Sequence, residues 1–272
     1  MTLAQKYDGE IICADSRTVY RGMNIGAAKP TAADRELVPH HLLDLIEPGE
    51  TYSAAQFKVD AEQVIASISL SNHLPIVVGG TGLYVNALLY DYQFPAGARD
   101  DLRVALEQLG MKQLVEKLRA EDLEMASQID LKNPRRVIRA LETVGQPRQK
   151  SVQLNSNSLL VGLRPSDEQL NKQITHRLQA MFEVGLIEEN RQLFSKYGSG
   201  LEAFRSPGYA EIIDYLAGRT TRQVAEELIN LHTRQLVRRQ LTWFKRNPDI
   251  KWCATSAQAE ALVAVWLKDR YT

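Results

Sequence analysis

Short apolar runs separated by polar segments dominate the first ninety residues of this chain. Residues 11–14 are rich in β-branched side chains and too few for a helix, so they predict a buried strand. Residues 75–80 repeat this pattern and lead into a glycine-rich turn, and residues 38–46 hold a short alternating strand. These three segments predict a sheet in the first part of the chain.

Helical segments lie between and after the strands. Ser53 begins a helix with Gln56 three residues on, which is the spacing of a capping box, and residues 83–89 form a helix after the last strand. Strands and helices in this alternating order predict a parallel, doubly wound α/β sheet.

The pattern changes near residue 97. Residues 97–147 are helical and charged and carry no strand signal, whereas residues 159–163 restore a strand and residues 250–253 predict a short edge strand. We therefore expect an α/β core that is interrupted by an α-helical insertion domain. The core would comprise residues 1–96 and 151–272, and the insertion residues 97–150.

Composition is that of an ordinary globular protein and narrows the choice of partners. Hydrophobic residues make up 44% and charged residues 24%, with a formal net charge of zero, so a nucleic-acid partner would be held by local basic patches. Cys13 and Cys253 give neither a disulfide framework nor metal-ligand spacing, which favours a cytoplasmic protein. No apolar run approaches the ~20 residues of a membrane span, so we expect no membrane partner.

Asp15 comes directly after the first predicted strand. Ligands of open α/β sheets lie outside the carboxyl ends of the strands, so this carboxylate faces the expected cleft. Ser16, Arg17 and Thr18 follow it and add two hydroxyl groups and a cation. The alternative is a surface aspartate that caps a turn.

The strand predicted at 75–80 runs into a glycine-rich turn, residues 79–82. Its glycines allow a ligand or another backbone to approach closely, and Thr81 can donate a hydrogen bond there. No Lys-Ser or Lys-Thr pair follows, so the turn is not a Walker A loop. A purely structural corner is the alternative.

Two helices carry concentrated positive charge. In the first, Asn133 caps a helix whose arginines share one arc, while Val137, Ile138 and Leu141 share another. Guanidinium groups spaced in this way suit a diphosphate or an RNA backbone. The arginines are Arg135, Arg136 and Arg139. A solvated face remains the alternative.

The second basic helix, predicted over residues 233–246, has cations on one side and no acid among them. Such a patch in a chain of zero net charge points to nucleic-acid phosphates, with a solvated amphipathic helix as the alternative. Its cations are Arg234, Arg238, Arg239, Lys245 and Arg246. His40 and His41 are adjacent in a predicted strand and point to opposite faces, so we predict no metal site there.

Taken in order, these segments resemble the tRNA dimethylallyltransferases, or tRNA isopentenyltransferases, almost from end to end. The resemblance is carried by residues 14–16, 19–23, 25–26, 28–30, 38–41, 79–84, 133–136, 139–142, 208–209 and 239–244. It implies a P-loop-NTPase-like parallel sheet flanked by helices, with an α-helical insertion domain. It also implies transfer of a dimethylallyl group from dimethylallyl diphosphate to the N6 amine of adenosine-37, next to the anticodon, in tRNAs that read codons beginning with U.

The resemblance also assigns roles to residues. Asp15 would take the proton of the amine, and Arg136 and Arg139 would assist departure of the diphosphate together with Mg²⁺ bound to it. The partners would be the tRNA anticodon stem-loop and dimethylallyl diphosphate, and we expect a monomer. The positions that would contact tRNA are Asp15, Ser16, Arg17, Thr18, Thr81, Arg103, Arg135, Arg136, Val137, Ile138 and Arg139.

The chain departs from the family at its start. The family opens with a strand and a Gly-Pro-Thr-Ala-x-Gly-Lys-Thr loop, whereas residues 1–9 look like the end of the helix that should follow, stopped by Gly9. We therefore expect a fragment, a wrong start, or a protein that has lost donor binding. Two further function classes stay open: a tRNA-binding protein without catalysis, and a small-molecule P-loop kinase.

Overall fold

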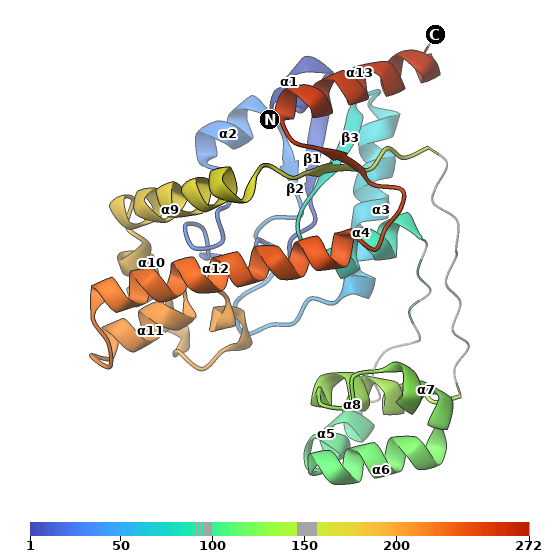
Figure 1. Cartoon of the computed structure of the whole chain (residues 1–272), viewed down its shortest axis with the longest axis vertical. Helices are drawn as coiled ribbons and strands as arrows, with labels where there is room; N and C mark the ends of the chain where they lie inside the picture. The colour runs from blue at the N-terminus through green and yellow to red at the C-terminus, as the bar shows by residue number, and fades with distance from the viewer. Residues whose placement is uncertain (91, 93, 95–99, 146–156, 272) are drawn as a thin grey trace. The chain divides into compact units, whose positions relative to one another are not determined.

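The computed structural model describes residues 1–90, 92, 94, 100–145 and 157–271. The chain divides into two compact units (Figure 1). The first, here called the core unit, comprises Met1–Asp91 and Val152–Thr272, and the second, the helical unit, comprises Tyr92–Ser151.

A three-stranded parallel sheet organises the first part of the core unit. Its central strand is β1 (Gly9–Cys13), which pairs with β2 (His40–His41) on one side and β3 (Leu74–Val78) on the other. The predicted strand over residues 38–46 shortens to two residues, because Leu42 and Asp44 adopt left-handed backbone conformations that no strand accommodates.

Helices α1 (Thr2–Lys6), α2 (Ala32–Leu37), α3 (Ala54–Leu70) and α4 (Gly82–Leu89) accompany this sheet. Ser53 and Gln56 form the predicted capping box at the start of α3. Phe57, fully buried on α3, stacks on Tyr84 of α4 with ring centroids 4.4 Å apart, and this pair fixes the two helices to each other.

Gly9 does not stop the first helix as predicted. Helix α1 already ends at Lys6, and Gly9 is the first residue of β1. A Cβ atom at Gly9 would lie 2.9 Å from both the Ile76 side chain and the Leu74 carbonyl oxygen of β3. Glycine is therefore present because β1 and β3 approach closely, not because a helix has to end.

The later part of the core unit is mainly helical. Strand β4 (Val161–Leu163) pairs in parallel with β5 (Lys251–Cys253), which is the predicted edge strand. The helices are α9 (Asp167–Glu183), α10 (Leu186–Tyr197), the 3₁₀ helix η1 (Glu202–Arg205), α11 (Ala210–Leu216), α12 (Arg222–Phe244) and α13 (Ser256–Tyr271). The basic helix predicted over 233–246 thus begins eleven residues earlier and ends at Phe244, so Lys245 and Arg246 follow it.

The helical unit consists of short helices around an apolar core. They are α5 (Asp100–Glu107), α6 (Met111–Glu121), α7 (Leu123–Gln128) and α8 (Pro134–Glu142). Leu106, Leu114, Leu118 and Val137 are buried together. As predicted, the Asn133 side chain caps α8, with Pro134 at its first position.

No helix in the described parts of the chain is both long and apolar enough to span a membrane.

Candidate functional site

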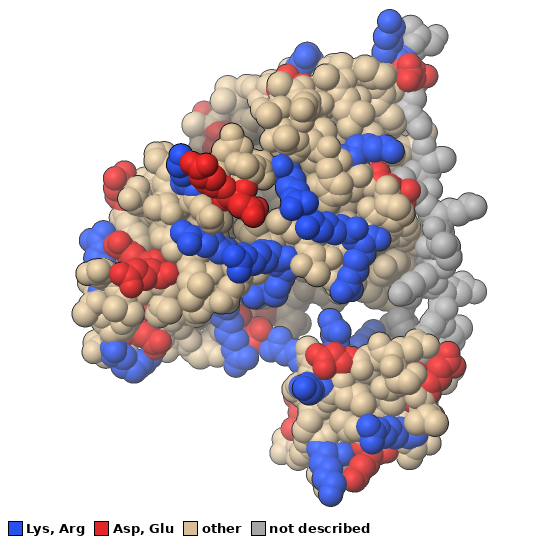
Figure 2. All heavy atoms as spheres, viewed as in Figure 1, with Lys and Arg blue, Asp and Glu red and all other residues tan. Residues whose placement is uncertain are grey.

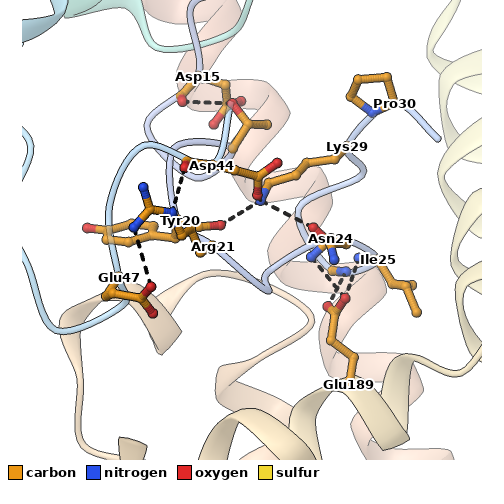
Figure 3. A network of polar contacts seen from close by, with 12 residues as sticks. Asp15, Tyr20, Arg21, Asn24, Ile25, Lys29, Pro30, Asp44, Glu47 and Glu189 are labelled. Atoms are coloured by element: carbon orange, nitrogen blue, oxygen red, sulfur yellow. Dashed lines mark hydrogen bonds and ion pairs between the residues drawn. The ribbon is translucent and has the colours of Figure 1, made fainter. Parts of the chain in front are cut away.

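Asp15 lies two residues after the end of β1, at the start of a turn over residues 15–19 that is here called the Asp15 turn (Figure 3). Its Oδ1 atom accepts a hydrogen bond from the backbone N–H of Arg17 at 2.8 Å, and the Thr18 hydroxyl donates to the Asp15 carbonyl oxygen at 3.1 Å. The turn-capping role considered above is therefore real. Oδ2 has no hydrogen-bond partner among the described residues, so it remains able to accept one from a ligand.

Thr81 joins the Asp15 turn to the glycine-rich turn after β3. Its Oγ1 atom accepts the backbone N–H of Ser16 at 2.9 Å and lies 3.3 Å from the Ser16 hydroxyl oxygen. The Thr81 N–H in turn donates to the Ala14 carbonyl oxygen at 3.2 Å. Asp15 and Ser16, which the sequence placed after one strand, and Thr81, which it placed after another, therefore come together at the carboxyl edge of one sheet.

The glycines of this turn allow other atoms to approach the backbone closely, and these atoms belong to the protein itself. A Cβ at Gly79 would lie 2.0 Å from the Ala14 carbonyl oxygen, and one at Gly80 2.1 Å from Nε2 of Gln240. One at Gly82 would lie 2.2 Å from Cδ1 of Trp243. Helix α12 thus packs directly on the turn that carries Thr81.

Gln240 and Trp243 are site residues that the sequence did not reveal. Trp243 packs beside Gly82 and remains 37% exposed. The sequence does show a glycine-rich turn and, far from it, a helix that carries a large aromatic residue. No local pattern indicates that these two segments are in contact.

Arg17 and Thr18 are both used within the protein. Thr18 is buried, and its hydroxyl fixes the turn rather than facing a ligand. Arg17 Nη1 lies 3.3 Å from the carbonyl oxygens of Glu202 and Ala203, which attaches the Asp15 turn to η1.

The sequence also did not reveal that the ammonium group of Lys29, which donates to the Tyr20 carbonyl oxygen, is buried. Its side chain is 1% exposed and its Nζ lies 2.6 Å from Oδ1 of Asp44 (Figure 3). Burial lowers the pKa of Lys29, against the opposing effect of Asp44. Burial also opposes ionisation of Asp44, but hydrogen bonds from Lys29 and Arg35 outweigh it and hold the pKa of Asp44 below its usual value.

Cations along the C-terminal half of α12 and directly after it form an exposed basic surface, and Figure 2 shows Lys and Arg side chains gathered along this helix. Arg238, Arg239, Lys245 and Arg246 are exposed and form no ion pair within the described parts of the chain. Arg234 is different, because it is half-buried in a groove between α9 and α12 and its Nε atom is buried without a hydrogen-bond partner among the described residues.

In the helical unit, Glu142 brings two of the candidate arginines together. Its side chain is 1% exposed, Arg139 Nη1 lies 3.1 Å from Oε2, and Arg103 Nη1 lies 3.5 Å from Oε1. Arg135 and Arg136 are exposed at the start of α8.

The predicted contacts of Val137 and Ile138 with tRNA are not contacts of exposed side chains. Both are buried in the apolar core of the helical unit, because α8 packs this face on its neighbours. Their side chains therefore cannot contact RNA, and any contact at these positions would use the backbone.

The histidines of β2 have partners within the protein. His40 Nδ1 lies 2.8 Å from the Val38 carbonyl oxygen, and His41 Nε2 lies 2.6 Å from Oε2 of Glu10. In the parts of the chain that the structure describes, no group of three or more His, Cys, Asp or Glu residues could bind a metal ion.

Comparison with known proteins gives a consistent result. The model of the IPP transferase family matches residues 18–247. The tRNA dimethylallyltransferase of Pelotomaculum thermopropionicum is 41% identical over 263 residues, which cover 92% of this chain and 84% of the relative. That of Geobacillus kaustophilus is 42% identical over 265 residues, covering 93% and 84%.

Solved structures agree. The full-length tRNA isopentenylpyrophosphate transferase of Bacillus halodurans superposes with a TM-score of 0.72 at 34% identity, covering 98% of this chain and 90% of that one. A eukaryotic dimethylallyltransferase acting on tRNA gives a TM-score of 0.81 at 25% identity, covering 94% and 70%. These neighbours confirm the predicted P-loop-NTPase-like α/β fold, and nothing in the comparisons favours a kinase or a protein that only binds tRNA. The chain belongs to the IPP transferase family, whose members are tRNA dimethylallyltransferases, enzymes that prenylate tRNA.

Proposed function

We propose that this chain transfers the dimethylallyl group of dimethylallyl diphosphate to the N6 amine of the adenosine next to the anticodon, in tRNAs that read codons beginning with U. A bond forms between N6 and the allylic carbon while the bond from that carbon to the diphosphate oxygen breaks. The electron pair of the broken bond leaves with the diphosphate, and N6 loses one proton. Family membership supports the reaction class.

The observation that carries the assignment of the site is the state of the Asp15 carboxylate. The Arg17 N–H holds Oδ1 and thereby fixes the orientation of the group, while Oδ2 has no partner among the described residues. A carboxylate held in this way can accept a hydrogen bond from the amine and take its proton as the N–C bond forms. Alignment of the amine on the allylic carbon would supply much of the acceleration.

The adenine has to leave its stack to reach Asp15, which costs a few kcal/mol that phosphate contacts would offset. We assign these contacts to the exposed cations after and along α12 and, in the helical unit, to Arg103, Arg135, Arg136 and Arg139. Arg136 and Arg139 are also the residues that we assign to the diphosphate, because guanidinium groups bind phosphate oxygens bidentately.

The residues present do not by themselves form a Mg²⁺ site. Since the described residues hold no suitable carboxylate cluster, the ion would have to be carried by the oxygens of the diphosphate and by water, and we assign no step to it. The buried free thiols of Cys13 and Cys253 support a reducing compartment, and we propose that the protein acts in the cytoplasm.

One assay tests the proposal. The protein is incubated with unmodified tRNA and labelled dimethylallyl diphosphate and, in parallel, with ATP alone. We expect label in tRNA from the wild-type chain, and none from Asp15→Asn, which keeps the acceptor for Arg17, while tRNA affinity stays within a few-fold.

Each other outcome has a definite meaning. Binding of tRNA without label overturns the proposed function, and consumption of ATP without tRNA identifies a kinase instead. An Asp15→Asn variant that transfers at the wild-type rate excludes Asp15 as the base.

A further inference from the structure

The ammonium group of Lys29 uses all of its hydrogen-bonding capacity inside the protein. It donates to the Tyr20 carbonyl oxygen at 2.5 Å, to Oδ1 of Asp44 at 2.6 Å and to Oδ1 of Asn24 at 3.3 Å (Figure 3). An ammonium has three donors, so none is left over for a ligand. Burial of a cation is costly unless it is paired in this way, and the proposed transfer step gives Lys29 no direct role.

Two of these acceptors lead to the Asp15 turn. Tyr20, whose carbonyl Lys29 binds, lies five residues after Asp15. The backbone N–H of Asp44 donates to the Thr18 carbonyl oxygen at 3.2 Å. The Thr18 hydroxyl then donates to the carbonyl oxygen of Asp15. Lys29 therefore fixes the residues that follow Asp15 through both their own backbone and the neighbouring loop.

The loop that carries Lys29 is itself held by a single carboxylate, that of Glu189 in the first turn of α10. Its Oε2 accepts the backbone N–H groups of Asn24 and Ile25 at 2.9 and 2.7 Å, and its Oε1 accepts that of Gly26 at 3.0 Å. The Tyr209 hydroxyl donates to Oε1 at 2.8 Å. Three successive N–H groups on one carboxylate form a nest, which leaves this loop little freedom.

We propose that Lys29, with its loop held by Glu189, is a positioning residue that sets the orientation of the Asp15 carboxylate for the transfer reaction. The inference rests on the proposed function, since it gives Asp15 the role of base. Loss of the ammonium frees the Tyr20 carbonyl oxygen and Oδ1 of Asp44, whose Oδ2 keeps Arg35, so the turn after Asp15 becomes more mobile while the sheet persists. Binding of tRNA, which we assign to other residues, is retained.

The test uses Lys29→Met, which keeps the length of the side chain and removes its donors. Lys172→Met is the matched control, because Lys172 forms an exposed ion pair with Glu168 in the same unit. In Lys29→Met we expect amide hydrogen exchange over residues 14–21 to be about tenfold faster. We expect the single-turnover rate at saturating tRNA to fall about a hundredfold, because a misplacement of 1 Å has that effect, with the Kd for tRNA within about threefold. We expect the control variant to change neither the exchange over residues 14–21 nor the single-turnover rate.

Glu189→Gln keeps the proposal testable where Lys29→Met does not fold, and we expect the same pattern of faster exchange with a smaller loss of rate. Unchanged exchange over residues 14–21, or an unchanged rate, in a folded variant overturns the proposal. So does a loss that falls on tRNA binding instead of the rate. Amide hydrogen exchange can be measured without any transfer activity. A wild-type chain that transfers no label would therefore overturn the proposed function, while the exchange rates would still show whether Lys29 fixes the turn.

Discussion

The hydroxyl oxygen of Thr81 lies 2.9 Å from the backbone nitrogen of Ser16 and accepts its hydrogen bond. These residues follow different strands, so one side-chain oxygen joins the carboxyl ends of β3 and β1. Because Ser16 is next to Asp15, the position of the carboxylate depends on a residue 66 positions away in the sequence.

Thr81→Val removes this acceptor while keeping the branched shape of the side chain. The Ser16 N–H is then left without a partner in a partly buried position, which costs about 1 kcal/mol. We expect a loss of that size in the free energy of unfolding measured in urea, and a transfer rate lowered about tenfold. Thr81→Ser keeps the hydroxyl and should be close to wild type. Equal behaviour of the two variants would show that the hydrogen bond is unimportant.

Alanine substitutions in the glycine-rich turn should differ in severity according to what each Cβ meets. At Gly79 it meets the backbone of Ala14, which cannot move aside, so we expect a loss of about 3 kcal/mol. At Gly80 it meets the end of the flexible Gln240 side chain, and we expect about 1 kcal/mol. Gly49→Ala is the control, since a Cβ there has no neighbour within 4 Å among the residues that the structure describes. Urea unfolding of the three variants tests this order, and similar losses at Gly79 and Gly80 would contradict it.

The parts of the fold that local patterns specify were predictable. The capping residues Ser53 and Asn133 and the strand before Asp15 all lie where the sequence placed them, because each depends on neighbours within a few positions. The N-terminal half of α12 was missed for a physical reason. Val224 and Leu231 are exposed there, so apolar residues lie on both sides of the helix and the amphipathic pattern fails.

The supports of the candidate site could not be found in the same way. Glu189 lies more than 160 positions from the N–H groups that it accepts, and nothing in its own helix distinguishes it from Glu188 beside it. In the sequence Lys29 is an ordinary loop lysine, and only the tertiary structure shows the hydrogen-bond acceptors that surround it. Contacts of this kind depend on how distant segments pack, which periodicity does not contain.

Removal of positive charge from the C-terminal half of α12 should weaken the dependence of tRNA affinity on salt concentration. The slope of log K against log salt concentration falls by about one unit for each phosphate that the protein no longer neutralises. We expect Arg238→Gln combined with Arg239→Gln to weaken binding and to reduce the slope by about two. Arg222→Gln, on the same helix but already paired with Glu226 at 2.7 Å, is the control and should leave the slope unchanged. An unchanged slope in the double variant would assign Arg238 and Arg239 to a solvated face.

Glu10 should make stability depend on pH, because its carboxylate lies between two histidines. Oε1 lies 2.5 Å from Nδ1 of His73 and Oε2 lies 2.6 Å from Nε2 of His41. The hydrogen bonds to His73 and His41 hold the pKa of Glu10 below its usual value, and the bond to Glu10 raises the pKa of His73. Ionised Glu10 stabilises the fold above the unfolded-state pKa of about 4.3, and this contribution is lost as pH falls through the lowered value. Protonated His73 stabilises the fold below its unfolded-state pKa of about 6.5, and that contribution is lost as pH rises through the raised value.

The difference in unfolding free energy between wild type and Glu10→Gln should therefore be larger near pH 5.5 than near pH 9, roughly the two sides of the His73 titration. Urea unfolding at the two pH values measures this difference, and a difference that stays constant over the range would exclude protonation of His73 as its cause.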